Sequence, residues 1–295
     1  MAVSQGNKPA RLYDYEKQVT NMDWGKSNRL ARIFPDGKTL MLAADHGYFM
    51  GPTTKLENPR QTLMPLIPHV DALMTTRGVI RNCISSHSNV PVVLRVSGGP
   101  TMAREPRRLE DEWLTTSIED ALRLNACAVA LQTFSGTDYE SRTIKHLAEL
   151  VNEGEKCGMP VLGVVALGDE YTNKSNDPRY LAMACRILAE HGAAFVKTYY
   201  CDGFDKVVDG CYVPLVVAGG PQPKDNIDKD MFTFELAHKA IQDGASGLDF
   251  GRKVWQSENP IGVARALHAI VHKNFTAKEA YDLFNETKIE KLIEE

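Results

Sequence analysis

A lysine at the end of a short apolar run is the residue with the clearest chemical potential in this chain. Residues 193–196 read Ala-Ala-Phe-Val, and Lys197 follows them directly. Lysine is rarely buried without a partner, and burial lowers the pKa of its ammonium group. A neutral amine attacks carbonyl carbons, so Lys197 is a candidate nucleophile. The alternative is a structural lysine whose stem packs against the strand while its ammonium group reaches water.

A carboxylate follows the first apolar run of the chain. Asp45, His46 and Gly47 come directly after residues 39–44. If that run and the run before Lys197 are parallel strands, Asp45 faces the amine and could hold it as an ammonium ion or carry protons. The alternative is that Asp45 caps a helix and begins a turn.

Other polar side chains also follow apolar runs, and we expect them to meet at the same end of the fold. The residues expected to contact substrate are His46, Arg77, Arg95, Gln132, Phe134 and Tyr199. Residues expected to bind a phosphate follow the last two runs, namely Gly219, Gly220, Gly251 and Arg252. Glycine exposes backbone N–H groups, and a neighbouring guanidinium group completes a dianion site. Ordinary loop glycines are the alternative.

Eight short apolar runs, which we interpret as strands, precede these groups and would position them. They span residues 39–44, 71–75, 91–96, 126–132, 160–166, 194–197, 213–218 and 246–250. Most lack strict alternation of apolar and polar residues, which is typical of parallel strands covered on both faces. Eight strand–helix units in about 250 residues predict an α/β fold, the (β/α)₈ TIM barrel. A doubly wound open sheet is the rival fold, but no G-x-G-x-x-G motif follows the first run.

Helical spacing separates the runs. The sequence predicts helices over residues 138–156, 178–190 and 229–243, and a further helix that Ser117 and Asp120 begin as in a capping box. Gly158, Gly192 and Gly244 follow three of these helices and are expected in the left-handed conformation. We expect one barrel at residues 37–276, an N-terminal arm at 1–36 and a charged C-terminal helix at 277–295.

Composition excludes several classes of protein. The chain has 34 basic and 38 acidic residues and a net charge of −4, so nucleic-acid binding has no electrostatic support. No run approaches a membrane span, and the polar N-terminus is no secretory signal. The six cysteines form no C-x-x-C pair, so we expect a cytoplasmic protein. His268 and His272 lie four residues apart and could share a metal ion, but no third ligand is apparent and we expect no metal site.

Several phrases together resemble the class I, Schiff-base aldolase family, which includes deoxyribose-phosphate aldolase and the archaeal-type fructose-bisphosphate aldolases. The resemblance covers about residues 23–274. The matching phrases are residues 42–54, 196–200, 217–220 and 244–252, followed by Trp255 and Gln256. It implies that Lys197 is the covalent lysine, that Asp45 is the active-site carboxylate and that the glycines with Arg252 hold phosphate. It also implies a homo-oligomer built from rings of five.

The chain departs from the family at one position. The family's aldolases place a tyrosine at the end of the fourth strand as general acid/base, and this chain has Phe134 there. Phenylalanine has no proton to give, and losing such a group lowers rates about 10²–10⁴-fold. Tyr48, Tyr199 or a held water could substitute.

Three functions therefore remain open. The branch that the chain most resembles transfers an acetyl group from 3-hydroxy-5-phosphonooxypentane-2,4-dione to coenzyme A, which would be a co-substrate and not a bound cofactor. A fructose-bisphosphate aldolase or related ketose-phosphate aldolase is the second. A degenerate barrel that binds a sugar phosphate without turnover is the third, and Phe134 is its sequence support.

Overall fold

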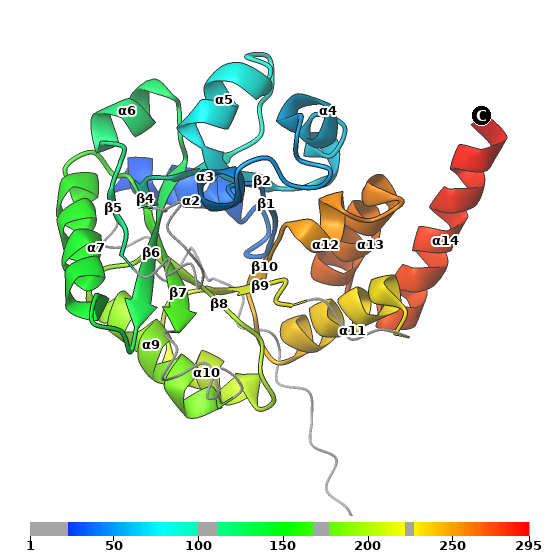
Figure 1. Ribbon diagram of the computed structural model, residues 1–295. Coiled ribbons are helices and arrows are strands. Elements are labelled where there is room, and N and C mark those ends of the chain that lie inside the picture. The colour runs from blue at the N-terminus through cyan, green and yellow to red at the C-terminus, as the bar shows by residue number, and fades with distance from the viewer. Residues whose placement is uncertain (1–22, 100–110, 168–176, 222–226, 295) are drawn as a thin grey trace, which may run out of the picture.

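Eight parallel strands form the centre of the molecule in a computed structural model that describes residues 23–99, 111–167, 177–221 and 227–294. The strands are β1 (Thr39–Ala43), β2 (Ala72–Thr76), β3 (Val92–Arg95), β6 (Ala128–Ser135), β7 (Val161–Leu167), β8 (Phe195–Thr198), β9 (Leu215–Ala218) and β10 (Gly247–Phe250). They close in the order β1-β10-β9-β8-β7-β6-β3-β2 (Figure 1). The predicted TIM barrel is confirmed, and each strand overlaps its predicted run.

Alternate residues of each strand face two different cores, because successive side chains point to opposite faces of a sheet. Met41, Val93 and Phe195 belong to a cluster inside the barrel. Their neighbours Leu42, Leu94 and Val196 belong to the larger cluster between the strands and the helices. This alternation decides which strand residues reach the mouth of the barrel.

Helices surround the barrel (Figure 1). Those within the ring are α4 (Pro59–Leu63), α5 (Arg77–Cys83), α6 (Ile118–Arg123), α7 (Glu140–Glu155), α9 (Pro178–Glu190), α10 (Phe204–Gly210), α11 (Lys229–Gln242) and α13 (Pro260–Lys273). Shorter helical turns are α3 (Gly47–Met50), η2 (Ile67–His69) and α12 (Arg252–Trp255).

The predicted helix boundaries rest on local chemistry that the structure confirms. The Ser117 side chain accepts a hydrogen bond from the Asp120 N–H and begins α6. Gly158, Gly192 and Gly244 have φ angles of +64°, +95° and +102°, as expected for glycines that end helices.

The two ends of the chain add one helix each. Helix α2 (Trp24–Ile33) closes the N-terminal end of the barrel, where Leu30, Ile33 and Phe34 join the interior cluster. Phe34 meets Phe195 edge to face, with ring centroids 5.3 Å apart. Helix α14 (Ala277–Glu294) packs against α11 and α13 and extends from the ring (Figure 1). Within the described residues, no helix combines the length and apolarity needed to cross a membrane.

A small hairpin near the mouth was not predicted. β4 (Ser97–Gly98) pairs in antiparallel fashion with β5 (Trp113–Leu114). The sequence predicts that Gly98 and Gly99 form a turn before an irregular loop with Arg104, Arg107 and Arg108. Those three arginines lie outside the described residues. The hairpin matters because it brings Glu112 to the active-site end.

Candidate active site

Lys197 points into the barrel, because it shares the face of Phe195 on β8. Its Nζ lies 2.7 Å from Oδ2 of Asp249 on β10, and the two side chains are 12% and 0% exposed. A sheltered amine therefore stands at the mouth with a carboxylate beside it, as nucleophilic attack on a carbonyl requires.

Asp45, which we expected to face the amine, forms its ion pair with a different group. Asp45 Oδ2 accepts a hydrogen bond from Arg95 Nη1 at 3.0 Å, and Asp249 takes the place beside Lys197. The sequence analysis did not predict Asp249 as a site residue. An aspartate inside the apolar phrase Gly-Leu-Asp-Phe could have indicated it, because buried charged residues are rare.

Burial raises the pKa of the Asp249 carboxyl, and the neighbouring Asp45 carboxylate raises it further. The charges of Lys197 and Arg95 act in the opposite direction. A carboxyl with a raised pKa accepts a proton more readily than a surface aspartate does. Asp249 is thus placed to take the proton of the Lys197 ammonium group and release the amine.

Arg95 organises the neighbouring part of the mouth. Its Nη2 donates to Glu112 Oε2 at 2.7 Å and to Gln132 Oε1 at 3.2 Å. The Tyr48 hydroxyl donates to Glu112 and accepts from Arg95. Two carboxylates thus surround one guanidinium group, which is 2% exposed. Such a network fixes side chains in one geometry, because each buried charge has a partner.

His46 lies beside this network as a neutral imidazole. Desolvation lowers its pKa to about 4, although Asp45 acts to raise it. Within the described residues, its buried Nδ1 has no hydrogen-bond partner, and it lies 3.7 Å from Asp45 Oδ1. A neutral imidazole with a free nitrogen can accept a proton, so His46 is a candidate to replace the missing tyrosine.

Phe134 is buried and 4% exposed. It shares the face of Ala128 and Ala130 on β6, which lie in the interior cluster. Its position therefore faces the barrel mouth as the resemblance implies, but it supplies apolar surface there and no proton.

The expected phosphate residues lie together at the ends of β9 and β10, which are adjacent strands. Gly220 has a φ angle of +64°. A Cβ at Gly251 would lie 2.6 Å from the Ala43 carbonyl oxygen, so only glycine fits that close approach. Arg252 begins α12.

Lys253 completes this group, and sequence reasoning missed it. Its stem passes Gly219, where an added Cβ would lie 3.3 Å from Lys253 Cδ. The residue is 6% exposed, and within the described residues its Nζ has no hydrogen-bond partner. Burial and the charge of Arg252 lower its pKa to about 8. A buried cation without a carboxylate is costly, and an anionic ligand would remove that cost.

The remaining predicted residues border the mouth. Tyr199 follows β8 and is 37% exposed. Arg77 begins α5 and lies 3.6 Å from Asp120. A cavity of about 210 Å³ joins Arg77 and Arg95 with Tyr48 and Trp113. The mouth therefore continues into an open space lined by guanidinium groups and aromatic rings.

Comparisons with known proteins agree with this site. The model of the DeoC/LacD family aldolases matches residues 39–257. The 3-hydroxy-5-phosphonooxypentane-2,4-dione thiolase of Yersinia enterocolitica is 45% identical over 271 residues, or 91% of this chain and 89% of the relative. The thiolase of the same name from Escherichia coli K12 is 45% identical over 266 residues, or 89% and 88% of the two chains.

A solved structure shows the same fold. It is an archaeal fructose-1,6-bisphosphate aldolase with its catalytic lysine covalently bound to the carbinolamine intermediate of the substrate. Its TM-score is 0.72 at 27% identity, covering 83% of this chain and 99% of that one. The resemblance that the motifs indicated is confirmed: the chain belongs to the DeoC/LacD aldolase family and is an enzyme of the aldolase superfamily.

Proposed function

We propose that this enzyme transfers an acetyl group from 3-hydroxy-5-phosphonooxypentane-2,4-dione to coenzyme A and leaves dihydroxyacetone phosphate. The observation that supports it most is the buried Lys197–Asp249 pair, 2.7 Å apart, beside the glycines and Lys253. The 45% identity to the named thiolases supports the choice of substrate.

The reaction begins with release of the amine. Asp249 accepts a proton from the Lys197 ammonium group, and the amine condenses with the ketone next to the phosphorylated carbon, losing water. Lys253, Arg252 and the backbone of Gly219 and Gly220 hold the phosphate. This grip on a non-reacting group orients the carbonyl toward Lys197.

Acetyl transfer follows. The thiolate of coenzyme A adds to the remote carbonyl, and the bond between that carbon and the hydroxyl-bearing carbon breaks. The iminium ion on Lys197 accepts the released electron pair as an enamine. Protonation of the enamine carbon and hydrolysis of the iminium give dihydroxyacetone phosphate and acetyl-CoA. We assign the proton of the thiol to His46, whose imidazole is neutral at pH 7 because burial lowers its pKa to about 4.

The space lined by Trp113, Tyr48 and Arg77 is the route by which coenzyme A, the second substrate, would reach the mouth. An extended thiol with a charged nucleotide end needs an open route to the mouth, and guanidinium groups with an aromatic face suit phosphates and adenine.

Fructose-bisphosphate aldolase is the second candidate, supported by the solved structures at 27% identity. Incubating the enzyme with each substrate separates the two functions. We expect acetyl-CoA to form from the pentanedione and coenzyme A faster than triose phosphates form from fructose 1,6-bisphosphate, because the relatives at 45% identity are named for the first reaction. Rapid release of triose phosphates from fructose 1,6-bisphosphate without acetyl transfer would establish the aldolase instead.

A further inference from the structure

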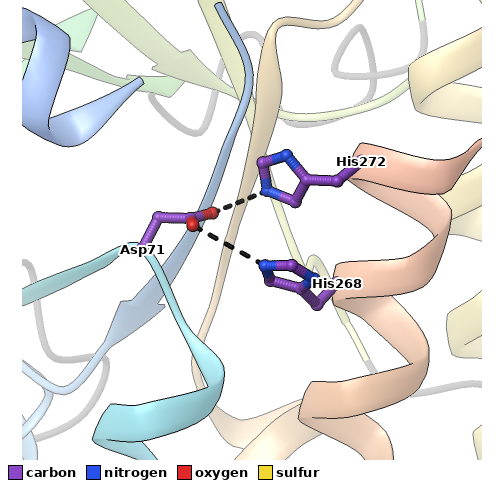
Figure 2. Close-up of side chains that lie close together, drawn as sticks. All are labelled: Asp71, His268 and His272. Atoms are coloured by element: carbon purple, nitrogen blue, oxygen red, sulfur yellow. Dashed lines mark hydrogen bonds and ion pairs between the residues drawn. The ribbon is translucent and has the colours of Figure 1, made fainter. Parts of the chain in front are cut away.

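Three potential metal ligands meet at the opposite end of the barrel from the active site. Asp71 precedes β2, and His268 and His272 lie one turn apart on α13 (Figure 2). One ligand atom from each lies within 4.8 Å of the others. Among the described residues, no other group of three histidine, cysteine or acidic side chains meets in this way.

No third ligand is apparent near the two histidines in the sequence, because Asp71 lies about 200 positions away. Barrel closure brings them together, since α13 packs beside β1 and η2, and β1 pairs with β2. The two imidazole rings lie close together, with centroids 4.3 Å apart and planes tilted by 37°, and each presents a nitrogen to the same carboxylate (Figure 2).

We propose that Asp71, His268 and His272 bind a divalent transition-metal ion of the zinc class. His272 Nε2 lies 2.8 Å from Asp71 Oδ2, and His268 Nε2 lies 3.7 Å from Asp71 Oδ1. Ligand atoms bound to tetrahedral zinc lie about 3.3 Å apart, which falls between these two distances. Two imidazole nitrogens and one carboxylate oxygen are donors that zinc prefers over magnesium or calcium.

The surroundings of the three ligands also fit a metal ion. The other ring nitrogen of His272, Nδ1, lies 2.8 Å from Asp36 Oδ2. When a metal ion is bound, a carboxylate at this position holds the proton on Nδ1 and leaves the lone pair of Nε2 to the metal. The Leu40 N–H donates to Asp71 Oδ2 at 2.6 Å and orients the carboxylate. Asp36 and Asp71 together supply the negative charge that balances a divalent cation.

The placement predicts a structural ion. His272 and Asp71 are each 11% exposed, whereas His268 is 40% exposed, so solvent can reach a fourth coordination position. The three ligands would connect α13, the last helix of the barrel, to the start of β2. The contact between His272 and Asp36 would also connect the segment before β1. Stabilising groups are expected at this end of a TIM barrel, and the chemistry lies at the other end.

Binding of Co²⁺ and Zn²⁺ to the full-length protein tests the site. The protein is stripped with EDTA, titrated with Co²⁺ by visible absorption, and dialysed against Zn²⁺ for elemental analysis. We expect one equivalent of zinc per chain, a d–d absorption band with Co²⁺, and a melting temperature at least about 5 °C higher at 100 times the Kd.

Variants separate this site from adventitious binding. His268→Gln should weaken Zn²⁺ binding at least about 10-fold, and the half-exposed position of that side chain protects the fold. His272→Gln should weaken it further, whereas His191→Gln, at the exposed end of α9, should leave it unchanged. The acetyl-transfer rate should stay within about twofold in all three.

Two results would overturn the proposal. One is the absence of stoichiometric zinc and of a cobalt band in the unmodified protein, which would leave His272 as an imidazolium ion between Asp36 and Asp71. The other is equal zinc binding by the unmodified protein and both cluster variants. Neither result bears on acetyl transfer, which the substrate assays test independently.

Discussion

Two buried carboxylates at the barrel mouth have different partners and therefore different tasks. Asp249 lies beside the Lys197 amine, and Asp45 holds Arg95. Sequence reasoning placed Lys197 and Asp45 at the mouth because both follow apolar runs. It could not decide which carboxylate meets the amine, since that depends on how the strands pair around the barrel.

Replacing Asp249 with asparagine tests its task. The variant loses the group that accepts the lysine proton, so we expect kcat to fall about 10²–10⁴-fold. Steady-state acetyl transfer measures the effect, with circular dichroism to confirm folding. Asp45→Asn is the matched variant and should retain more activity, because Asp45 pairs with Arg95. A kcat for Asp249→Asn within twofold of the unmodified enzyme would remove Asp249 from the mechanism.

Lys253 provides a separate test of phosphate binding. Lys253→Met keeps most of the stem and removes the charge. A hydrogen bond to a charged group contributes about 1.5–3 kcal/mol, so KM for the phosphorylated substrate should rise about 10–100-fold while kcat changes little. Inorganic phosphate should also inhibit the variant more weakly. Lys239→Met, an exposed position on α11, is the control, and an equal effect in both variants would show that Lys253 does not contact the phosphate.

At the scale of elements, the segment from β10 to α12 supplies much of the site. It carries Asp249, Gly251, Arg252 and Lys253 within five positions. β10 ends at Phe250, Gly251 follows, and α12 begins at Arg252, so Asp249 lies beside the amine and the two basic residues follow it in the first turn of the helix. The position of this segment therefore depends on how β10 pairs with β1 to close the barrel.

Gly247→Ala tests that closure. A Cβ at Gly247 would lie 2.2 Å from the Thr39 carbonyl oxygen, so β1 and β10 must separate to admit it. We expect the free energy of unfolding to fall by about 1–3 kcal/mol, as in other overpacked cores. Urea denaturation measures it. Gly78→Ala on α5, where the nearest atom is the Thr76 hydroxyl at 3.8 Å, is the control and should not destabilise the protein.

The elements show what the sequence can and cannot predict. Apolar runs predicted the strands, and capping residues and helix-ending glycines predicted several of the helices, because these signals act over a few residues. The hairpin of β4 and β5 went unpredicted, since each strand has two residues and no pattern. Glu112, beside that hairpin, was missed with it. Lys253 was missed because a lysine after an arginine in a helical turn resembles ordinary surface charge.

At the scale of the whole molecule, the two ends of the barrel have separate tasks. The mouth collects buried charges for chemistry, and α2 seals the opposite end with Leu30, Ile33 and Phe34. The folded protein favours one protonation state of each buried ionisable group at the mouth. The free energy of unfolding falls when the pH favours the other state.

His46 makes this effect measurable. Its folded-state pKa is about 4 and its unfolded pKa is about 6.5, so the unfolded chain binds the proton first as pH falls. The free energy of unfolding should therefore decrease between about pH 6.5 and 4, by up to about 3 kcal/mol from this residue. Urea unfolding with EDTA present should show a shallower pH dependence in His46→Gln than in the unmodified protein. His191→Gln is the control, and identical slopes in all three proteins would contradict the account.

The central claim is that Lys197 forms the covalent bond to substrate. Lys253, whose pKa burial and the charge of Arg252 lower to about 8, is the competing nucleophile at the mouth. Reduction with borohydride in the presence of dihydroxyacetone phosphate, followed by peptide mass spectrometry, distinguishes them. We predict one adduct, on Lys197, which persists in Lys253→Met and is absent from Lys197→Arg. An adduct on Lys253, or an unmodified Lys197 with the ketone bound, would contradict the account.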